Sequence, residues 1–166
     1  GPISRLPVMI HQLEVPTMSP SPLPQLDAEV FLADGGLETT LVFDDGIDLP
    51  DFAAFGLLDD AAGRQALVRY YDSYAAIAAQ AGVGIVLDTP TWRASTDWAA
   101  RQGFTLEDLI RLNQDAVALL ADTRRRHATS ATPVVISGAI GPRGDGYQAG
   151  ELMSVDEARS YHGVQA

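Results

Sequence analysis

Three short apolar runs recur along the chain, and a polar or glycine-rich stretch follows each of them. The runs cover residues 31–34, 83–88 and 133–140, so their starting points lie about 50 residues apart. Each run is apolar throughout rather than alternating, which is typical of a strand that is covered on both faces. The pattern therefore predicts three parallel strands joined by crossover helices.

The interval between the first two runs predicts a long helix. Apolar residues recur at spacings of three and four from Asp59 to Ala81, which places them on one stripe, and Gly82 stands where such a helix ends. Residues 95–102 predict a further short helical turn. The side chains of the long helix that we expect to face the core are Leu67, Tyr70, Tyr71, Tyr74, Ile77 and Ala78.

Capping signals predict two more helices. Thr105 with Asp108 resembles a capping box, in which each side chain bonds the backbone amide of the other residue, and it begins a helix that extends to about His127. Ser154 with Glu157 is the same signal for a last helix. The residues expected on the inner face of the first of these two helices are Leu109, Leu112, Val117, Leu119 and Leu120.

Three βα units in a row fit either a doubly wound sheet or the N-terminal part of a (β/α)8 TIM barrel. A complete barrel takes about 250 residues, and this chain has 166. We therefore predict an α/β fold of about three βα units that does not close. The third strand would then have an unpaired outer edge, which is a candidate surface for self-association.

The first 28 residues differ in composition from the rest. They contain six of the ten prolines, with serine and other polar residues between them. Proline fixes φ and removes a backbone donor, so residues 1–28 are predicted to be a flexible, Pro-rich leader, and residues 29–166 the folded domain. Met18 resembles a natural start, and the origin of the residues before it stays open.

The charge of the chain excludes several classes of partner. The net charge is -11, and all 11 basic residues are arginine. This balance disfavours nucleic acid and anionic membranes, both of which attract basic surfaces, and no apolar run approaches the roughly 20 residues of a membrane span. Without cysteine no disulfide can form, which fits a reducing compartment. We expect a cytoplasmic protein.

The loops that follow the three predicted strands carry the candidate chemistry. They read DGGLET at 34–39, DTPTWRAS at 88–95 and GAIGPRGD at 138–145, and the loops elsewhere in the chain are plainer. The carboxyl ends of parallel strands lie at one edge of a sheet, and binding sites gather there. We therefore predict that these three loops converge on one pocket.

Two interpretations of the first loop stay open. The Asp34 carboxylate could pair with a substrate ammonium group while Gly35 and Gly36 let the ligand approach the backbone. Alternatively, Asp34 caps a turn by accepting from backbone amides two residues further on. Glu38 is interpreted as a structural partner or a solvated residue.

The second loop has the same ambiguity. Thr89 and Thr91 offer hydroxyl groups to a ligand, and Trp92 could form an apolar wall. In the alternative, the hydroxyls bond the loop backbone and Trp92 packs beneath it. A metal site within the chain is not expected, because there is no cysteine and the three histidines lie far apart in the sequence, in the leader, at a helix end and in the last helix.

Together these loops resemble a known family. DGGLET at 34–39 resembles the opening signature of the homocysteine S-methyltransferase family. AGVG at 81–84, leading into 88–95, resembles the second signature, and SGAIGPRG at 137–144 resembles the third. The resemblance covers residues 30–166 in order and spacing.

The resemblance implies a (β/α)8 barrel and a methyltransferase. A methyl group would move from an activated donor (S-methylmethionine, S-adenosylmethionine, betaine or a methylfolate) to the zinc-bound thiolate of homocysteine, giving methionine. Zinc would keep the thiol ionised, since its ordinary pKa is about 8.5. By this resemblance, the substrate-binding residues are Asp34, Gly35, Gly36, Thr89, Thr91 and Trp92, of which Asp34 holds the ammonium group.

One departure from the family pattern concerns the metal. The zinc ligands of the family are cysteines from the later part of the barrel, and this chain contains no cysteine. The resemblance therefore implies a zinc cofactor whose ligands are absent from residues 1–166, and a segment that is inactive in isolation. The alternatives are a non-catalytic α/β module that binds a ligand or partner and, less favoured, a complete small enzyme of flavodoxin-like build.

Overall fold

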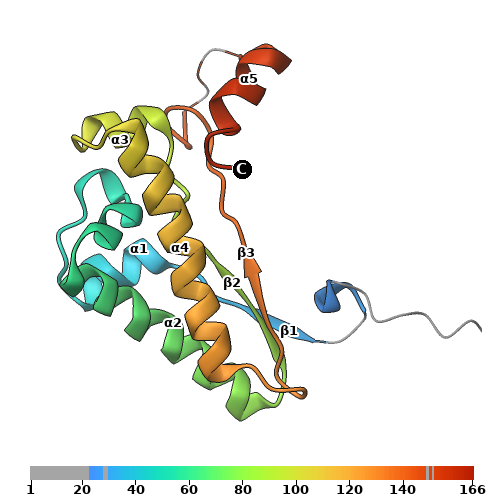
Figure 1. Cartoon of the computed structure of the whole chain (residues 1–166). Coiled ribbons are helices and arrows are strands. Elements are labelled where there is room, and N and C mark those ends of the chain that lie inside the picture. Colours follow the sequence, from blue (N-terminus) through green and yellow to red (C-terminus); the bar gives the residue numbers. More distant parts are fainter. Residues whose placement is uncertain (1–22, 28–29, 149, 151) are drawn as a thin grey trace, which may run out of the picture.

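The computed structural model describes residues 23–27, 30–148, 150 and 152–166 (Figure 1). Most of the segment predicted as a flexible leader therefore lies outside the described residues. In its described part, Pro24–Leu26 form a short 3-10 helix (η1). The fixed φ of proline suits the first position of such a helix.

The sheet has three parallel strands, as the apolar runs predict. The strands are β1 (Phe31–Ala33), β2 (Gly84–Asp88) and β3 (Val134–Ser137), in the spatial order β1-β2-β3. The third strand is shorter than the predicted 133–140. It ends at Ser137 because the backbone of Ala139 bonds side chains of the β2 loop instead of continuing the ladder.

Two long helices cover one face of the sheet. Figure 1 shows α2 (Ala61–Ala81) and α4 (Leu106–His127) side by side, and they contact each other, β2 and β3. The shorter helices α3 (Thr96–Arg101) and α5 (Val155–His162) follow the β2 and β3 loops. The predicted coverage of both faces is wrong for the described residues, because Ala33 is exposed and Val86 and Val135 are only half-buried.

The helix boundaries follow local chemistry. Both predicted capping boxes are confirmed: in each, the hydroxyl accepts from the third helical amide while the acidic side chain accepts from the cap amide. The Asp60 side chain caps α2, which therefore begins two residues later than predicted. Gly82 ends α2 with a φ of 68°, a left-handed conformation that favours glycine.

The segment between β1 and α2 is helical, which the sequence pattern does not predict. It consists of short irregular turns without a repeating apolar period, yet it buries Leu41, Phe55 and Leu58 in the core. The last turn packs so closely on α2 that a Cβ at Gly63 would overlap the Leu57 backbone. These turns are α1 (Leu37–Thr39), the π-helical η2 (Thr40–Asp44), η3 (Pro50–Phe52) and η4 (Ala54–Asp59).

The core prediction is wrong at two positions on the long helices. Ile77 is 54% exposed and Val117 is 50% exposed. Their neighbours Ala78 and Ala116 are buried instead. Successive helical residues are rotated by about 100°, so when the alanine of each pair faces the core the larger neighbour turns toward the solvent.

The outer edges of the sheet have no strand beside them among the described residues, since β1 and β3 each pair with β2. Three strands do not close a barrel, so the (β/α)8 architecture stays a prediction, as does self-association through an edge. No helix in the described part of the chain is long and apolar enough to cross a membrane.

A pair of substitutions in α4 tests the assignment of its buried face. Leu112→Ala removes a side chain with 0% exposure, and we expect it to lower the free energy of unfolding by about 2–5 kcal/mol. Val117→Ala changes a half-exposed side chain and should cost less than about 1 kcal/mol. Urea denaturation followed by circular dichroism measures both, and equal losses would contradict the assignment.

Candidate functional site

The Asp34 carboxylate lies at the carboxyl end of β1 and is held from two sides. Its Oδ1 accepts a hydrogen bond from the Asp88 amide on β2 at 2.8 Å, and its Oδ2 accepts from the Tyr70 hydroxyl on α2 at 3.2 Å. Asp34 therefore bridges to the neighbouring strand, which differs from the turn-capping alternative. These bonds leave the side chain little rotational freedom, so its orientation is set before any ligand arrives.

Three tyrosines of α2 support the strand ends. The Tyr70 and Tyr74 hydroxyls both donate to the Gly35 carbonyl oxygen at 2.8 Å, and the Tyr71 hydroxyl donates to the Asp88 carbonyl oxygen at 2.8 Å. The apolar stripe predicted from the sequence includes these residues, but the bonds of their hydroxyl groups were not predicted. The available signal was three tyrosines within five positions, because a buried tyrosine hydroxyl needs a partner.

The Thr89 and Thr91 hydroxyls join the β2 loop to the β3 loop. The Thr91 hydroxyl donates to the Ala139 carbonyl oxygen at 2.8 Å, and Thr89 Oγ1 accepts from the Ala139 amide at 2.9 Å. The two hydroxyls lie 2.6 Å apart. Because the Thr91 hydrogen is used on Ala139, Thr89 donates its own hydrogen to Thr91. Both hydroxyl hydrogens are thus used inside the protein, as the loop-backbone alternative expected.

Five of the six predicted substrate-binding residues line one pocket of about 200 Å³. We call it the Asp34 pocket. Thr91 is not among its lining residues and borders a neighbouring hollow with Asn113 and Gln165. The structure therefore brings together residues of all three predicted loops but leaves Thr91 aside. The Asp34 pocket is lined by Asp34, Gly35, Gly36, Leu37, Glu38, Asp88, Thr89, Trp92 and Ala139.

The Asp34 pocket is acidic. Three carboxylates line it, those of Asp34, Glu38 and Asp88, and no basic residue is among its lining residues in the described structure. Burial raises the pKa of Asp34 above its ordinary value, and the Asp88 charge adds to this, while the bonds from Asp88 and Tyr70 oppose it. Burial also raises the pKa of Glu38, against the opposing charge of Arg93. A cation in the pocket would favour the ionised form of both carboxyl groups and lower their pKa values.

Trp92 forms one wall of the pocket and fits tightly against the β3 loop. A Cβ at Gly141 would overlap the Trp92 carbonyl oxygen, so only glycine allows this approach. On the side of the β2 loop, the Arg93 guanidinium lies 4.7 Å from the Trp92 ring centre and 4.1 Å from that of Trp98. Stacking of this kind holds the Trp92 ring in a defined orientation.

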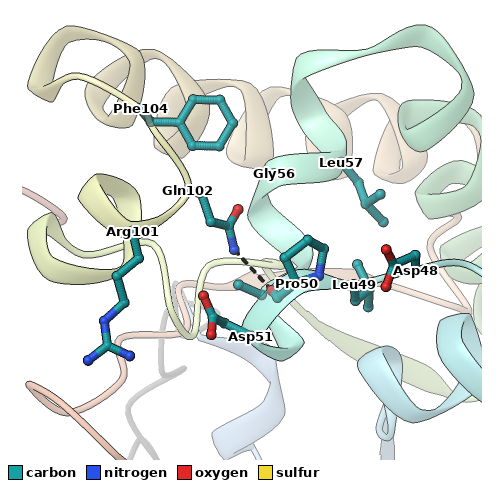
Figure 2. Close-up of a pocket in the computed structure, with 10 residues that line it drawn as sticks. Asp48, Leu49, Pro50, Asp51, Gly56, Leu57, Arg101, Gln102 and Phe104 are labelled. Atoms are coloured by element: carbon teal, nitrogen blue, oxygen red, sulfur yellow. Dashed lines mark hydrogen bonds between the residues drawn. The ribbon is translucent and has the colours of Figure 1, made fainter.

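A second hollow lies away from the predicted residues. Figure 2 shows it between the η3–η4 segment and the α3–α4 connection, where the Gln102 amide donates to the Pro50 carbonyl oxygen at 3.0 Å. Its volume is about 430 Å³, and Asp48, Asp51 and Arg101 lie at its rim. It is the roomier of the two, but none of its lining residues comes from the three converging loops, so we do not assign the family chemistry to it.

The described residues of this chain do not fit a zinc site that holds a thiolate. Such sites use cysteine, histidine or carboxylate ligands in groups of three or four. The sequence contains no cysteine, and the described residues contain no cluster of three or more His, Asp or Glu side chains able to hold a metal. We therefore derive no step through zinc from these residues.

The raised pKa of Asp34 predicts a pH dependence of stability. The folded state binds the Asp34 proton more tightly than the unfolded state, so the group's contribution to stability falls as pH rises from the ordinary pKa of 3.8 through the folded value. Asparagine does not titrate, so Asp34→Asn lacks this loss. The free energy of unfolding of Asp34→Asn minus that of wild type should therefore increase from about pH 3 to pH 7. Urea denaturation at each pH measures it, with Asp156→Asn on an exposed side chain as control; parallel curves for wild type and Asp34→Asn would contradict it.

Comparison with known families agrees with the geometry. The model of a family described as homocysteine S-methyltransferase matches residues 31–166, which include all three converging loops. No curated protein and no solved structure matches the chain. The match covers most of the sequence and confirms the resemblance predicted from the loop motifs. The chain belongs to the homocysteine S-methyltransferase family.

Proposed function

We propose that this chain holds the ammonium group of homocysteine in the Asp34 pocket, within a domain that transfers a methyl group to the homocysteine sulfur. The donor would be one that the family resemblance implies: S-methylmethionine, S-adenosylmethionine, betaine or a methylfolate. The observation that carries the proposal is the composition of the pocket, whose described lining contains three carboxylates and no basic side chain.

The hydrogen-bond accounting supports an ammonium ligand. The Gly35 carbonyl oxygen accepts from Tyr74, and Tyr70 shares its single hydroxyl hydrogen between this oxygen and Asp34. The two threonine hydroxyls are also used inside the protein. An ionised carboxylate has about four acceptor positions, and Asp34 uses one on each oxygen. A group with several N–H donors and a positive charge therefore matches what remains.

The negative charges of the pocket disfavour ionisation of the substrate thiol. A thiol has a pKa of about 8.5, and nearby negative charges raise it further. The described residues lack a metal-binding set that would hold the thiolate. We therefore infer that any zinc ligands come from outside residues 1–166, and that this chain alone does not transfer a methyl group. In a completed (β/α)8 barrel, the uncovered face of the sheet would face the barrel interior.

A non-catalytic module that binds an amine-bearing small molecule is the second candidate. The pocket is equally compatible with this candidate. Its described lining has acceptors for an ammonium group and no basic side chain that would favour ionisation of a thiol. The two candidates share the binding step and differ in whether methyl transfer follows it.

Binding of L-homocysteine tests the assignment of the ammonium site. Asp34→Asn should weaken binding at least about tenfold, because a charge-assisted bond is lost. An analogue without the amino group, 4-mercaptobutanoic acid, should bind weakly to both proteins. Isothermal titration calorimetry measures the affinities; equal binding of the two ligands to wild type would contradict an ammonium site.

Gly35→Ala tests whether the ligand approaches the backbone at this point. A Cβ at Gly35 would meet no atom within 4 Å, so the fold should tolerate it, while a ligand against Gly35 should be displaced. Gly138→Ala, where a Cβ also meets nothing within 4 Å, is the matched control. We expect unchanged melting temperatures for both variants, with binding of L-homocysteine lost in Gly35→Ala alone. Retained affinity in Gly35→Ala would remove this residue from the site.

Metal content tests the inference about zinc. The purified chain should contain much less than one zinc per molecule by mass spectrometry after dialysis. It should also form no methionine from L-homocysteine and S-methylmethionine, with or without added zinc. Tight stoichiometric zinc, or methionine formation, would overturn the inference that this chain is inactive alone.

A further inference from the structure

Two hydroxyls of α2 converge on the loop that carries Asp34. Tyr70 and Tyr74 lie one helical turn apart, with ring centres 4.9 Å apart, and both donate to the Gly35 carbonyl oxygen. The Tyr70 hydroxyl also lies 3.2 Å from Asp34 Oδ2. Burial, and then the Asp34 charge, raise the pKa of Tyr70, so its hydroxyl keeps its hydrogen.

The Tyr70 hydroxyl has fewer hydrogens than it has acceptors within reach. Tyr70 has one hydroxyl hydrogen and two acceptors, so it cannot serve Asp34 and Gly35 fully at the same time. Tyr74 removes the conflict, because it donates to Gly35 and leaves the Tyr70 hydrogen free to turn toward Asp34. Without Tyr74, the Gly35 carbonyl would draw that hydrogen away.

We propose that Tyr70 is a positioning residue of the ligand site, that its hydroxyl aims the Asp34 carboxylate at the incoming ammonium group, and that Tyr74 acts through Gly35 to keep the Tyr70 hydrogen on Asp34. This inference rests on the proposed function for the identity of the ligand. The contacts between the tyrosines and the loop do not depend on it. Neither residue contacts the reacting sulfur in this proposal.

The charged and titratable groups around Asp34 come from three elements. Glu38 from α1 and Asp88 at the end of β2 place negative charges beside it. From α2, Tyr70 donates to it, and the hydroxyls of Tyr71 and Tyr74 bond nearby backbone carbonyl oxygens. Burial and then the Asp88 charge raise the pKa of Asp34, and the bonds from the Asp88 amide and Tyr70 lower it. Loss of that bond should move the pKa of Asp34 in one direction, upward.

The experiment measures the pKa of Asp34 and the binding of L-homocysteine in the same variants. Carbon-13 NMR titration of the Asp34 carboxyl group gives the first, and calorimetry gives the second. The variants are Tyr70→Phe, Tyr74→Phe and the double substitution. Phenylalanine keeps each ring and removes only the hydroxyl. Tyr161→Phe, which removes a hydroxyl that bonds Ser95 in α3's cap instead, is the matched control.

The expected result is an ordered and non-additive series. The pKa of Asp34 should rise in Tyr74→Phe, rise further in Tyr70→Phe, and not rise again when the second substitution is added to Tyr70→Phe. Binding of L-homocysteine should weaken roughly tenfold in Tyr70→Phe and less in Tyr74→Phe. The control should match wild type. Because Tyr74 is more exposed than Tyr70, Tyr74→Phe keeps the test open if Tyr70→Phe folds poorly.

Failure of this inference differs from failure of the proposed function. An unchanged pKa of Asp34 in Tyr70→Phe, or additive effects of the two substitutions, would overturn the positioning role even if wild type binds L-homocysteine. Wild type that binds no L-homocysteine but shows the ordered pKa series would overturn the proposed ligand and leave the hydroxyl arrangement supported. Wild-type affinity in a folded Tyr70→Phe protein would also overturn the positioning role.

Discussion

The bridge from the Asp34 carboxylate to the Asp88 amide and the Tyr70 hydroxyl is the interaction on which the site depends. It joins the ends of two neighbouring strands and attaches both to the helix beneath them. A carboxylate buried without partners would lose its charge or unfold the loop, whereas one held by two donors keeps a set direction. The next residue, Gly35, is held to the same helix by the hydroxyls of Tyr70 and Tyr74.

The second and third loops are also joined to each other, but through hydroxyl groups and a glycine instead of a carboxylate. The hydroxyls of Thr89 and Thr91 bond the backbone of Ala139, and Gly141 lets Trp92 approach the β3 loop without overlap. These contacts use the hydrogens of both threonine hydroxyls inside the protein and hold the β3 loop against the β2 loop. The Asp34 pocket beside them is lined by three carboxylates, which is the basis of the proposed ammonium site.

The sequence predicted well those features that depend on a single local rule. Capping boxes depend on residues three positions apart, so Thr105 with Asp108 and Ser154 with Glu157 could be identified from the sequence. The rule was insufficient where packing chose between neighbours, as when Ala116 faced the core in place of Val117. The irregular turns between β1 and α2 have no period to detect, and the last of them, η4, packs against α2 and α4.

The sequence by itself determined the family, the three parallel strands and the gathering of their loops at one edge, because these depend on motifs and on chain direction. It also placed Asp34, Gly35, Gly36, Thr89 and Trp92 close enough in the sheet to share a pocket. Only the tertiary structure decided which polar groups remain available to a ligand. The sequence shows which hydroxyl and carboxylate groups are present, but it does not show their hydrogen-bond partners. These partners lie 50 residues or more away in the chain, as with Asp34 and Asp88 or Thr89 and Ala139.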